Sequence, residues 1–162
     1  MRRSKPQGSI AFPVRIPAPG EGKRGEAGYL SYLLRQAAGA VRLRLERSLA
    51  SLGVTPPQFL VLTMLDSYPG ASGADVARLT LLTPQTVHGI IGNLERAGLI
   101  ARSAHPVHGR VQVIELTQPG RTLLSRCKER AAKADAALKI GISPDEEAVI
   151  RRWLVGLATR TD

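Results

Sequence analysis

The sequence predicts a mainly α protein of the α+β class, in which one short β-hairpin lies between helices. Three observations indicate this class. From residue 26 onward, apolar residues recur at steps of three and four, which is the period of amphipathic helices. Ser or Thr followed directly by Pro marks helix starts at Thr55, Thr83 and Ser143. Two short runs of branched and alternating residues, 99–103 and 111–116, have the composition of strands.

The charge balance points to a polyanionic partner. The 162 residues include 23 Lys and Arg against 13 Asp and Glu, which gives a net charge of +10 and a pI near 10.8. A field of that sign favours nucleic acid. The single cysteine cannot form an internal disulfide, and the sequence contains neither an 18-residue apolar run nor the apolar core of a signal peptide. We therefore expect a cytoplasmic protein that does not enter a membrane.

Residues 1–25 are expected to form a disordered basic arm. They contain four prolines and four glycines, with six basic residues against one acidic residue, Glu21. Such a composition buries too little apolar surface to hold a fixed structure. The arm either follows DNA phosphates or is only a solvated extension.

Residues 26–54 are predicted to form a long helix that takes part in dimerisation. At 1.5 Å per residue this helix would run roughly 39 Å, which is longer than a domain of this size needs for its own core. Part of its apolar stripe should therefore face another chain. The stripe consists of Leu30, Leu33, Leu34, Ala37, Val41, Leu45, Leu49 and Leu52.

Residues 55–117 contain three predicted short helices and the hairpin. Thr55, Ser72 and Thr83 each open a helix, and Gly98 ends the third. Three short helices, the last two joined by a brief turn, are typical of a helix-turn-helix, and the hairpin after them is typical of a wing. The expected inward residues are Phe59, Leu62, Met64 and Leu65 in the first helix, Val76 and Leu79 in the second, and Val87, Ile90, Ile91 and Leu94 in the third.

Residues 118–162 are predicted to form two closing helices that also serve dimerisation. A full capping box, Ser143 with Glu146, opens the second of them. The apolar positions are Leu123 or Leu124, Cys127, Ala131, Ala134 and Leu138 in one helix, and Val149, Ile150, Trp153, Leu154 and Leu157 in the other.

The chain resembles the MarR family of winged helix-turn-helix regulators over about residues 27–160. The resemblance is carried by VTPPQFLVLTML, by ADVARLTLLTPQTVHGIIGNLERAGLI and by GRVQVIELTQPGRTLL. The order of long helix, winged domain and two closing helices is more specific than any one of these motifs. The resemblance implies a homodimer held by the first and the last two helices, a palindromic operator in double-stranded DNA, and release controlled by a small molecule, a metal or an oxidant.

The sequence departs from the family pattern in two places. The wing usually carries Asp-x-Arg, whereas this chain has His108-Gly109-Arg110, so Arg110 matches the residue that reaches the minor groove while its acidic partner is absent. In the third helix Gly89 stands where the family often has a basic residue, and Gly92 where it often has an acidic one. Contacts common in relatives are therefore not assumed at these two glycines.

The two glycines need a physical reason, because each costs a helix about 0.5–1 kcal/mol relative to alanine. Both lie off the stripe formed by Val87, Ile91 and Leu94. One reading is that the missing side chains let the helix backbone sit deeper in a DNA groove. The other is that Gly89 or Gly92 admits a close helix crossing inside the domain.

The candidate DNA contacts lie on this helix, on the following strand and in the wing. Gln85 and Asn93 suit bidentate contacts with adenine, and His88 suits guanine acceptors. Arg110 suits a narrow minor groove, whose negative potential attracts arginine. Thr83 is either a phosphate contact or only a helix cap, and Arg78, Arg96 and Arg102 are either phosphate contacts or solvated charges. The full set is Thr83, Gln85, Thr86, His88, Gly89, Asn93, Arg102, His108 and Arg110.

An effector pocket is the least specific expectation. The resemblance places it where the first helix and the dimerisation helices meet the winged domain, near Tyr29, Tyr32, Arg35 and Phe59. Aromatic side chains with an arginine suit an aromatic acid or its thioester. Ordinary core packing and a surface arginine explain the same residues equally well.

The remaining chemistry argues against other functions. The acidic residues are scattered and no glycine-rich loop follows a strand, so we expect no enzyme, no catalytic residues and no cofactor. His105 and His108 lack further ligands nearby for a metal, and Cys127 lies on an apolar stripe that suits an inert thiol. The alternative function is a winged helix that binds only proteins, which predicts an apolar patch in place of the polar set on the third helix.

Overall fold

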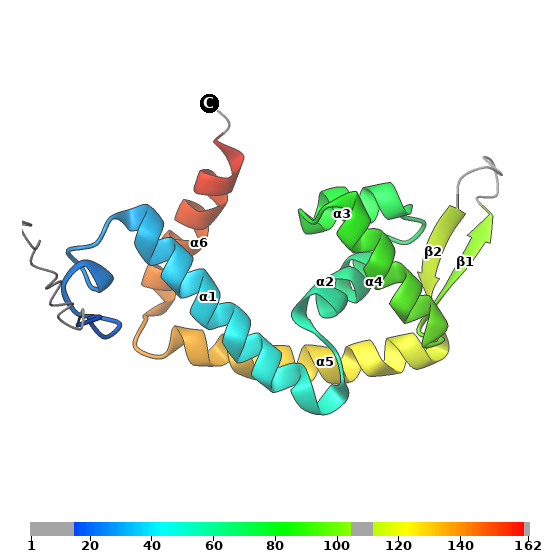
Figure 1. Ribbon diagram of the computed structural model, residues 1–162, viewed down its shortest axis with the longest axis horizontal. Helices are drawn as coiled ribbons and strands as arrows, with labels where there is room; N and C mark the ends of the chain where they lie inside the picture. The colour runs from blue at the N-terminus through cyan, green and yellow to red at the C-terminus, as the bar shows by residue number, and fades with distance from the viewer. Residues whose placement is uncertain (1–14, 105–111, 161–162) are drawn as a thin grey trace, which may run out of the picture. The chain divides into compact units, whose positions relative to one another are not determined.

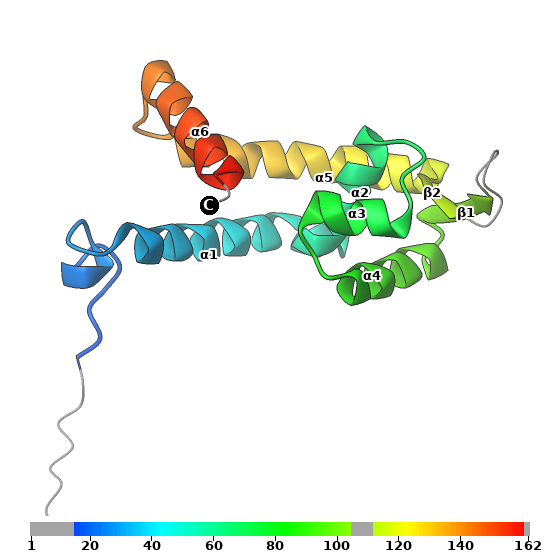
Figure 2. The same cartoon turned by 90° about the horizontal axis from the view of Figure 1, so that it is seen from above.

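The computed structural model describes residues 15–104 and 112–160 and confirms a mainly helical chain with one two-stranded sheet. The chain divides into two compact units, residues 1–40 and residues 41–162. Helix α1 (Leu30–Leu49) begins in the first unit, and its residues from Val41 onward belong to the second. Figures 1 and 2 give two views of the ribbon.

In the first unit, residues 17–28 form a hydrogen-bonded loop around the short 3-10 helix η1 (Gly22–Arg24). The guanidinium of Arg24 donates to the Pro17 carbonyl at 2.6 Å and to Gln36 Oε1 at 3.2 Å, and Ala18 N donates to a Glu21 carboxylate oxygen at 3.0 Å. The expectation of a disordered arm over residues 1–25 stays a prediction, and residues 1–14 lie outside the described residues. Side chains that satisfy backbone groups hold this loop, although it buries no residue in η1.

The long first helix starts later than its apolar pattern indicates. Residues 26–29 are not helical, and α1 runs from Leu30 to Leu49 before the 3-10 turn η2 (Ala50–Leu52). Gly53, at φ 67°, ends this turn in the left-handed region that glycine adopts without strain.

In the second unit, three short helices follow with the starts that the sequence predicts. They are α2 (Pro56–Ser67), α3 (Gly73–Thr80) and α4 (Pro84–Arg96). The side chains of Thr55, Ser72 and Thr83 each accept a hydrogen bond from the backbone N–H of the third residue of their helix, and Thr55 and Ser72 complete capping boxes. Gly98 has φ 69°, as its predicted role as a helix stop requires.

The wing is an antiparallel pair of strands, β1 (Ile100–Ala104) and β2 (Gln112–Leu116). Ile100 pairs with Leu116 at its base, and Ala104 pairs with Gln112 toward its tip. The free edge of β2 is also used, because Ile114 N donates to the Ala71 carbonyl at 3.2 Å. The hairpin is thus attached to the loop that joins α2 to α3.

The chain closes with α5 (Gln118–Ala136), the 3-10 turn η3 (Ala137–Lys139) and α6 (Pro144–Thr159). Ser143 and Glu146 form the capping box that the sequence predicts. Helix α6 contains no buried residue, so its apolar residues are not core positions of the single chain. Those with large exposed areas are Val149, Ile150, Trp153, Leu154, Val155 and Leu157.

One apolar cluster joins α2, α3, α4, both strands and α5, and Figure 1 shows these elements grouped, with α5 passing α2 and the base of the wing. The predicted inward residues Val87, Ile91 and Leu94 are buried, whereas Ile90 and Leu79 are only half-buried. Thr80 is buried instead, and its hydroxyl donates to the Val76 carbonyl at 2.7 Å. A second cluster contains Leu49, Val54 and Cys127, and Phe59 packs against both.

Leu81, in the turn between α3 and α4, combines two unfavourable features. Its φ of 55° lies in the left-handed region, and its side chain is 92% exposed. Since a leucine pays the steric cost of this backbone conformation and buries nothing in the described residues around it, glycine suits the position better.

We expect Leu81→Gly to raise the free energy of unfolding by about 1 kcal/mol. The left-handed conformation costs a residue with a Cβ about 1–2 kcal/mol, and the greater freedom of glycine in the unfolded chain cancels part of that gain. Urea unfolding followed by circular dichroism measures the change. Leu81→Ala is the control, because it keeps Cβ and should leave the stability nearly unchanged; equal effects of the two variants would contradict the explanation.

Candidate DNA-binding interface

The orientation of α4 follows from its buried side. Val87, Ile91 and Leu94 are 1–3% exposed and lie in the main apolar cluster. At 100° per residue, these three positions define one face of the helix, and the opposite face must point away from the core. That outward face carries Gln85, Gly89, Gly92 and Arg96, with Thr86 and Asn93 beside them.

The polar residues predicted on α4 are exposed. Gln85, Thr86, His88 and Asn93 all have exposed side chains, and no large apolar residue separates them. The hydroxyl of Thr83 is used locally, since it accepts from Thr86 N at 3.2 Å and lies 2.8 Å from the Thr86 hydroxyl. The cap proposed for Thr83 is therefore confirmed, whereas a contact between Thr83 and DNA stays a prediction.

The two glycines of α4 face open space. A Cβ built at Gly89 or Gly92 meets no atom of another element within 4 Å in the part of the chain that the structure describes. The close helix crossing considered for these glycines is therefore absent from that part of the chain. The helix backbone is exposed at Gly89 and partly exposed at Gly92, as the alternative of groove approach requires.

Arg96 is exposed and bonds back to its own helix. Its Nε donates to the Gly92 carbonyl at 3.2 Å, and its guanidinium also donates to Asn93 Oδ1. A bidentate contact with adenine uses both the oxygen and the NH2 group of the asparagine amide, so it requires Asn93 Oδ1 to be shared or released. The spacings of three and four residues were visible in the sequence, but the bonds that Arg96 makes to Gly92 and Asn93 were not.

Two other arginines are held by carboxylates. Arg102 of β1 pairs with Glu95 of α4 at 3.0 Å, with side chains 29% and 40% exposed. Arg78 pairs with Asp75 in the first turn of α3, and hydrogen bonds from Ser72 are the main cause that lowers the pKa of Asp75. Glu95 was not among the predicted site residues, because nothing local in the sequence shows that it faces β1.

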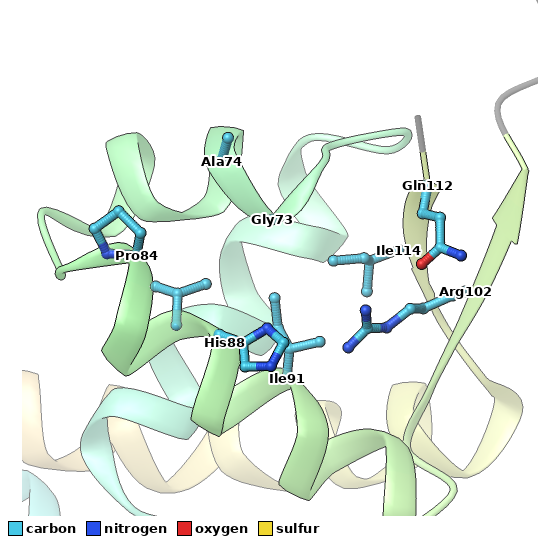
Figure 3. A pocket seen from close by; sticks show the side chains of 9 residues that line it. Gly73, Ala74, Pro84, His88, Ile91, Arg102, Gln112 and Ile114 are labelled. Atoms are coloured by element: carbon cyan, nitrogen blue, oxygen red, sulfur yellow. The ribbon is translucent and has the colours of Figure 1, made fainter. Parts of the chain in front are cut away.

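A hollow of about 280 Å³ lies between the start of α3, α4 and the strands. Figure 3 shows His88 and Arg102 at this hollow, His88 from α4 and Arg102 from β1, with Ile91 and Ile114 forming its apolar base. Two predicted DNA contacts therefore lie on neighbouring elements. His108 and Arg110, the predicted contacts in the wing loop, lie outside the described residues.

The predicted effector residues fall in different units. Tyr29, Tyr32 and Arg35 belong to the first unit and Phe59 to the second, so their common pocket stays a prediction. Within the second unit, Phe59 lines a groove of about 170 Å³. Arg44, which is not among the predicted effector residues, also lines this groove. The other lining residues are Val41, Leu45, Ala131, Ala134, Asp135 and Leu138.

Other chemistry is limited in the described part of the chain. Cys127 is fully buried, and desolvation raises the pKa of its thiol, an effect that Arg126 partly opposes. Among residues 15–104 and 112–160, no group of three His, Cys, Asp or Glu side chains is placed to hold a metal ion. No single helix there is long and apolar enough to cross a membrane, and only α1 with η2 and α2, as a bent pair, reaches the required length and composition.

Three short capped helices, a paired hairpin and a polar, glycine-containing face on the third helix define a winged helix-turn-helix protein. The sequence of residues 52–111 matches the model of the MarR family. A curated relative, the HTH-type transcriptional repressor Rv2887 of Mycobacterium tuberculosis, is 34% identical over 130 residues, which cover 80% of this chain and 94% of the relative. The chain belongs to the MarR family.

Solved structures of family members have the same fold. Rv2887 in complex with p-aminosalicylic acid is 32% identical, with a TM-score of 0.67 over 82% of this chain and 100% of that one. CouR from Rhodococcus jostii RHA1 bound to p-coumaroyl-CoA is 26% identical. Its TM-score is 0.76, and the match covers 84% of this chain and 96% of that one. CouR bound to a 23-mer DNA duplex is 28% identical, with a TM-score of 0.76 over 85% and 96%. BpsR of Bordetella bronchiseptica, whose DNA binding is regulated by 6-hydroxynicotinic acid, is 26% identical. Its TM-score is 0.77, and the match covers 84% of this chain and 97% of that one.

We expect Gly89→Ala to stabilise the protein and weaken its binding to DNA. Alanine raises helix stability by about 0.5–1 kcal/mol, because the new methyl group meets no neighbour. On a helix backbone that enters a groove, the same methyl group should reduce affinity about tenfold, the equivalent of about 1.4 kcal/mol. Thermal unfolding and fluorescence anisotropy with labelled DNA measure the two effects.

Gly39→Ala is the matched control, since Gly39 is a helical glycine of α1 that also faces open space. It should give a similar gain in stability with unchanged DNA affinity. Undiminished affinity in Gly89→Ala would show that the backbone of α4 does not approach DNA closely.

Proposed function

We propose that the protein is a homodimeric transcriptional repressor that binds a palindromic operator through α4 and the wing. The observation that carries this proposal is the division of α4 into a buried apolar face and an outward face of polar residues and glycines. An α-helix with such a face fits the major groove of DNA. The names of the relatives, among them the repressor Rv2887 and CouR bound to a DNA duplex, support the same function.

Exposed apolar surface on the last helix supports the dimer. The side chains of Trp153, Ile150 and Leu154 are 38–45% exposed, and those of Val149 and Leu157 are more exposed. A contiguous apolar face of this kind on a soluble chain marks an interaction surface. A second copy covers it in a closed, two-fold arrangement, and two-fold symmetry in turn requires a palindromic operator with half-sites about 34 Å apart.

The proposed effector is a small aromatic acid that enters the groove lined by Phe59 and Arg44. Phe59 and the leucines provide an apolar wall, and the Arg44 guanidinium provides the positive charge that a carboxylate needs. The volume of about 170 Å³ is below the usual range of about 300–1,000 Å³ for drug-sized ligands. A single-ring acid therefore suits this part of the pocket better than a coenzyme A thioester. Rv2887 was solved with p-aminosalicylic acid, which belongs to that class.

Specific binding can be tested with the DNA that flanks the protein's own gene. We expect saturable binding in fluorescence anisotropy that survives an excess of random DNA at moderate salt. Salt and competitor are essential, because a chain of net charge +10 binds any DNA weakly. Arg110→Ala should weaken this binding strongly, since it removes the arginine proposed to enter the minor groove, while light scattering shows an intact dimer.

Two outcomes would contradict parts of this proposal. Binding that random DNA abolishes equally would favour the winged helix as a module for protein contacts. Unchanged affinity in Arg110→Ala would remove the role of the wing while leaving the role of α4.

The effector site can be tested with salicylate as the probe. We expect salicylate to release DNA from the wild-type protein and to raise its melting temperature, because a ligand that binds only the folded state stabilises it. Arg44→Gln should shift the half-maximal salicylate concentration upward by about tenfold or more, in line with the loss of about 1.4–3 kcal/mol from a charged hydrogen bond.

Arg47→Gln is the control for the loss of one positive charge. Arg47 is exposed on the same helix and does not line the groove, so its substitution should leave the response to salicylate unchanged. Equal responses of the wild-type protein and Arg44→Gln would place the effector elsewhere.

A further inference from the structure

At the junction between β2 and α5, the first turn of α5 lies against the segment that follows α4. Thr117 stands between β2 and α5, and its hydroxyl both donates and accepts a hydrogen bond. Thr117 Oγ1 donates to the Gly98 carbonyl at 2.7 Å and accepts from Gly120 N at 3.1 Å. Its backbone N–H donates to the Leu99 carbonyl at 3.0 Å. One residue thus ties the first turn of α5 to the segment that follows α4.

Gly120 allows this approach. A Cβ built at Gly120 would lie 1.9 Å from the Leu99 carbonyl oxygen and 2.9 Å from the Leu99 carbonyl carbon. Backbone atoms cannot move aside as the end of a flexible side chain can. The first turn of α5 therefore packs directly on the backbone of Leu99, and only glycine fits there.

The other side of the junction belongs to α4. Leu99 N donates back to the Leu94 carbonyl at 3.0 Å, and Gly98 N donates to the Glu95 carbonyl at 2.9 Å. Hydrogen bonds consequently run without a break from the last turn of α4, through Gly98 and Leu99, to the first turn of α5. Figure 2 shows the start of α5 beside the base of the wing.

This use of a capping hydroxyl is specific to Thr117. The hydroxyls of the other capping residues, Thr55, Ser72, Thr83 and Ser143, bond to residues in the first turn of their own helices. Within residues 15–104 and 112–160, Thr117 is the capping residue whose hydroxyl also reaches a different element. A cap alone would not require that second bond.

We propose that Thr117 and Gly120 are positioning residues that set the angle between α4 and α5 and thereby the separation of the two recognition helices in the dimer. The inference rests on the proposed function, since it needs a dimer and an operator with two half-sites. Helix α5 has 19 residues and a length of about 28 Å. A rotation of about 5° at one end displaces the other by about 2.5 Å, which is close to the rise of about 3.4 Å per base pair along DNA. A loosened junction should therefore make the protein tolerant of half-site spacing.

The test measures affinity as a function of spacing. Operator duplexes with one base pair added or removed at the centre are titrated with the wild-type protein and its variants. We expect the wild type to lose about tenfold or more in affinity for each altered spacing, within the range of about 1–3 kcal/mol for a defective base pair. Thr117→Val has nearly the same shape but no hydroxyl. Its affinity for operators of altered spacing should fall by less than about threefold relative to its affinity for the normal spacing.

Two further variants separate positioning from capping. Thr117→Asp keeps an acceptor for Gly120 N but cannot donate to the Gly98 carbonyl, so it should also flatten the spacing profile while it preserves the helix cap. It replaces Thr117→Val if that variant does not fold. Thr117→Ser keeps both bonds and should restore the steep profile of the wild type.

Thr55→Val is the control for lost stability. It removes the cap of α2 at a similar cost of about 1 kcal/mol, but it leaves the junction intact. Its profile should stay as steep as that of the wild type. A steep profile in both Thr117→Val and Thr117→Asp, or an equally flat one in Thr55→Val, would overturn the inference. If the wild type itself shows no specific operator binding, the proposed function fails, and the inference fails with it.

Discussion

Burial of one face of α4 is the constraint on which the rest of the winged domain depends. Val87, Ile91 and Leu94 are almost inaccessible to solvent, and the elements around them, α2, α3, both strands and α5, share the same cluster. Because the side chains of a helix are fixed in direction by its backbone, the burial of these three residues decides which side chains face outward. The polar residues and glycines of α4 are displayed together as a consequence of packing on the other side.

The ion pairs beside α4 position arginine side chains more than they stabilise the fold. The pairs Arg102 with Glu95 and Arg78 with Asp75 are at least partly exposed, and exposed ion pairs contribute little to folding. Their effect is to limit where long arginine side chains lie beside α4. A protein with a large positive charge holds any DNA, so specificity must come from groups whose positions are set in this way.

The winged domain and the last helix differ in how much apolar surface they bury. The winged domain has its own core, whereas α6 has no buried residue and a face of exposed apolar side chains that includes Trp153. Such a helix is incomplete as part of a monomer, and the proposed dimer follows from that incompleteness. The rigid junction at Thr117 and Gly120 would then transmit the geometry of the dimer to the DNA-binding surface, and an effector in the groove of Phe59 and Arg44 would act on the same linkage.

By itself, the sequence determined the features that arise between residues close in the chain. Helix starts at Thr55, Ser72, Thr83 and Ser143, the turn at Gly98 and the hairpin could be predicted, because caps and periodic burial depend on neighbours within about four residues. The most buried residues of α4 followed from the same periodicity. The start of α1 and the burial of Leu79 were less accurately predicted, since fraying and tertiary packing decide them.

Only the tertiary structure decided contacts between residues far apart in the sequence. The fit of Gly120 against Leu99, the attachment of Ile114 to Ala71, the pairing of Arg102 with Glu95 and the groove shared by Arg44 and Phe59 have no local signal. The same holds for the two glycines of α4, since composition could not distinguish a close helix crossing from open space. Each of these features depends on where separate elements meet, and that is set by the packing of the whole domain instead of the properties of any one segment.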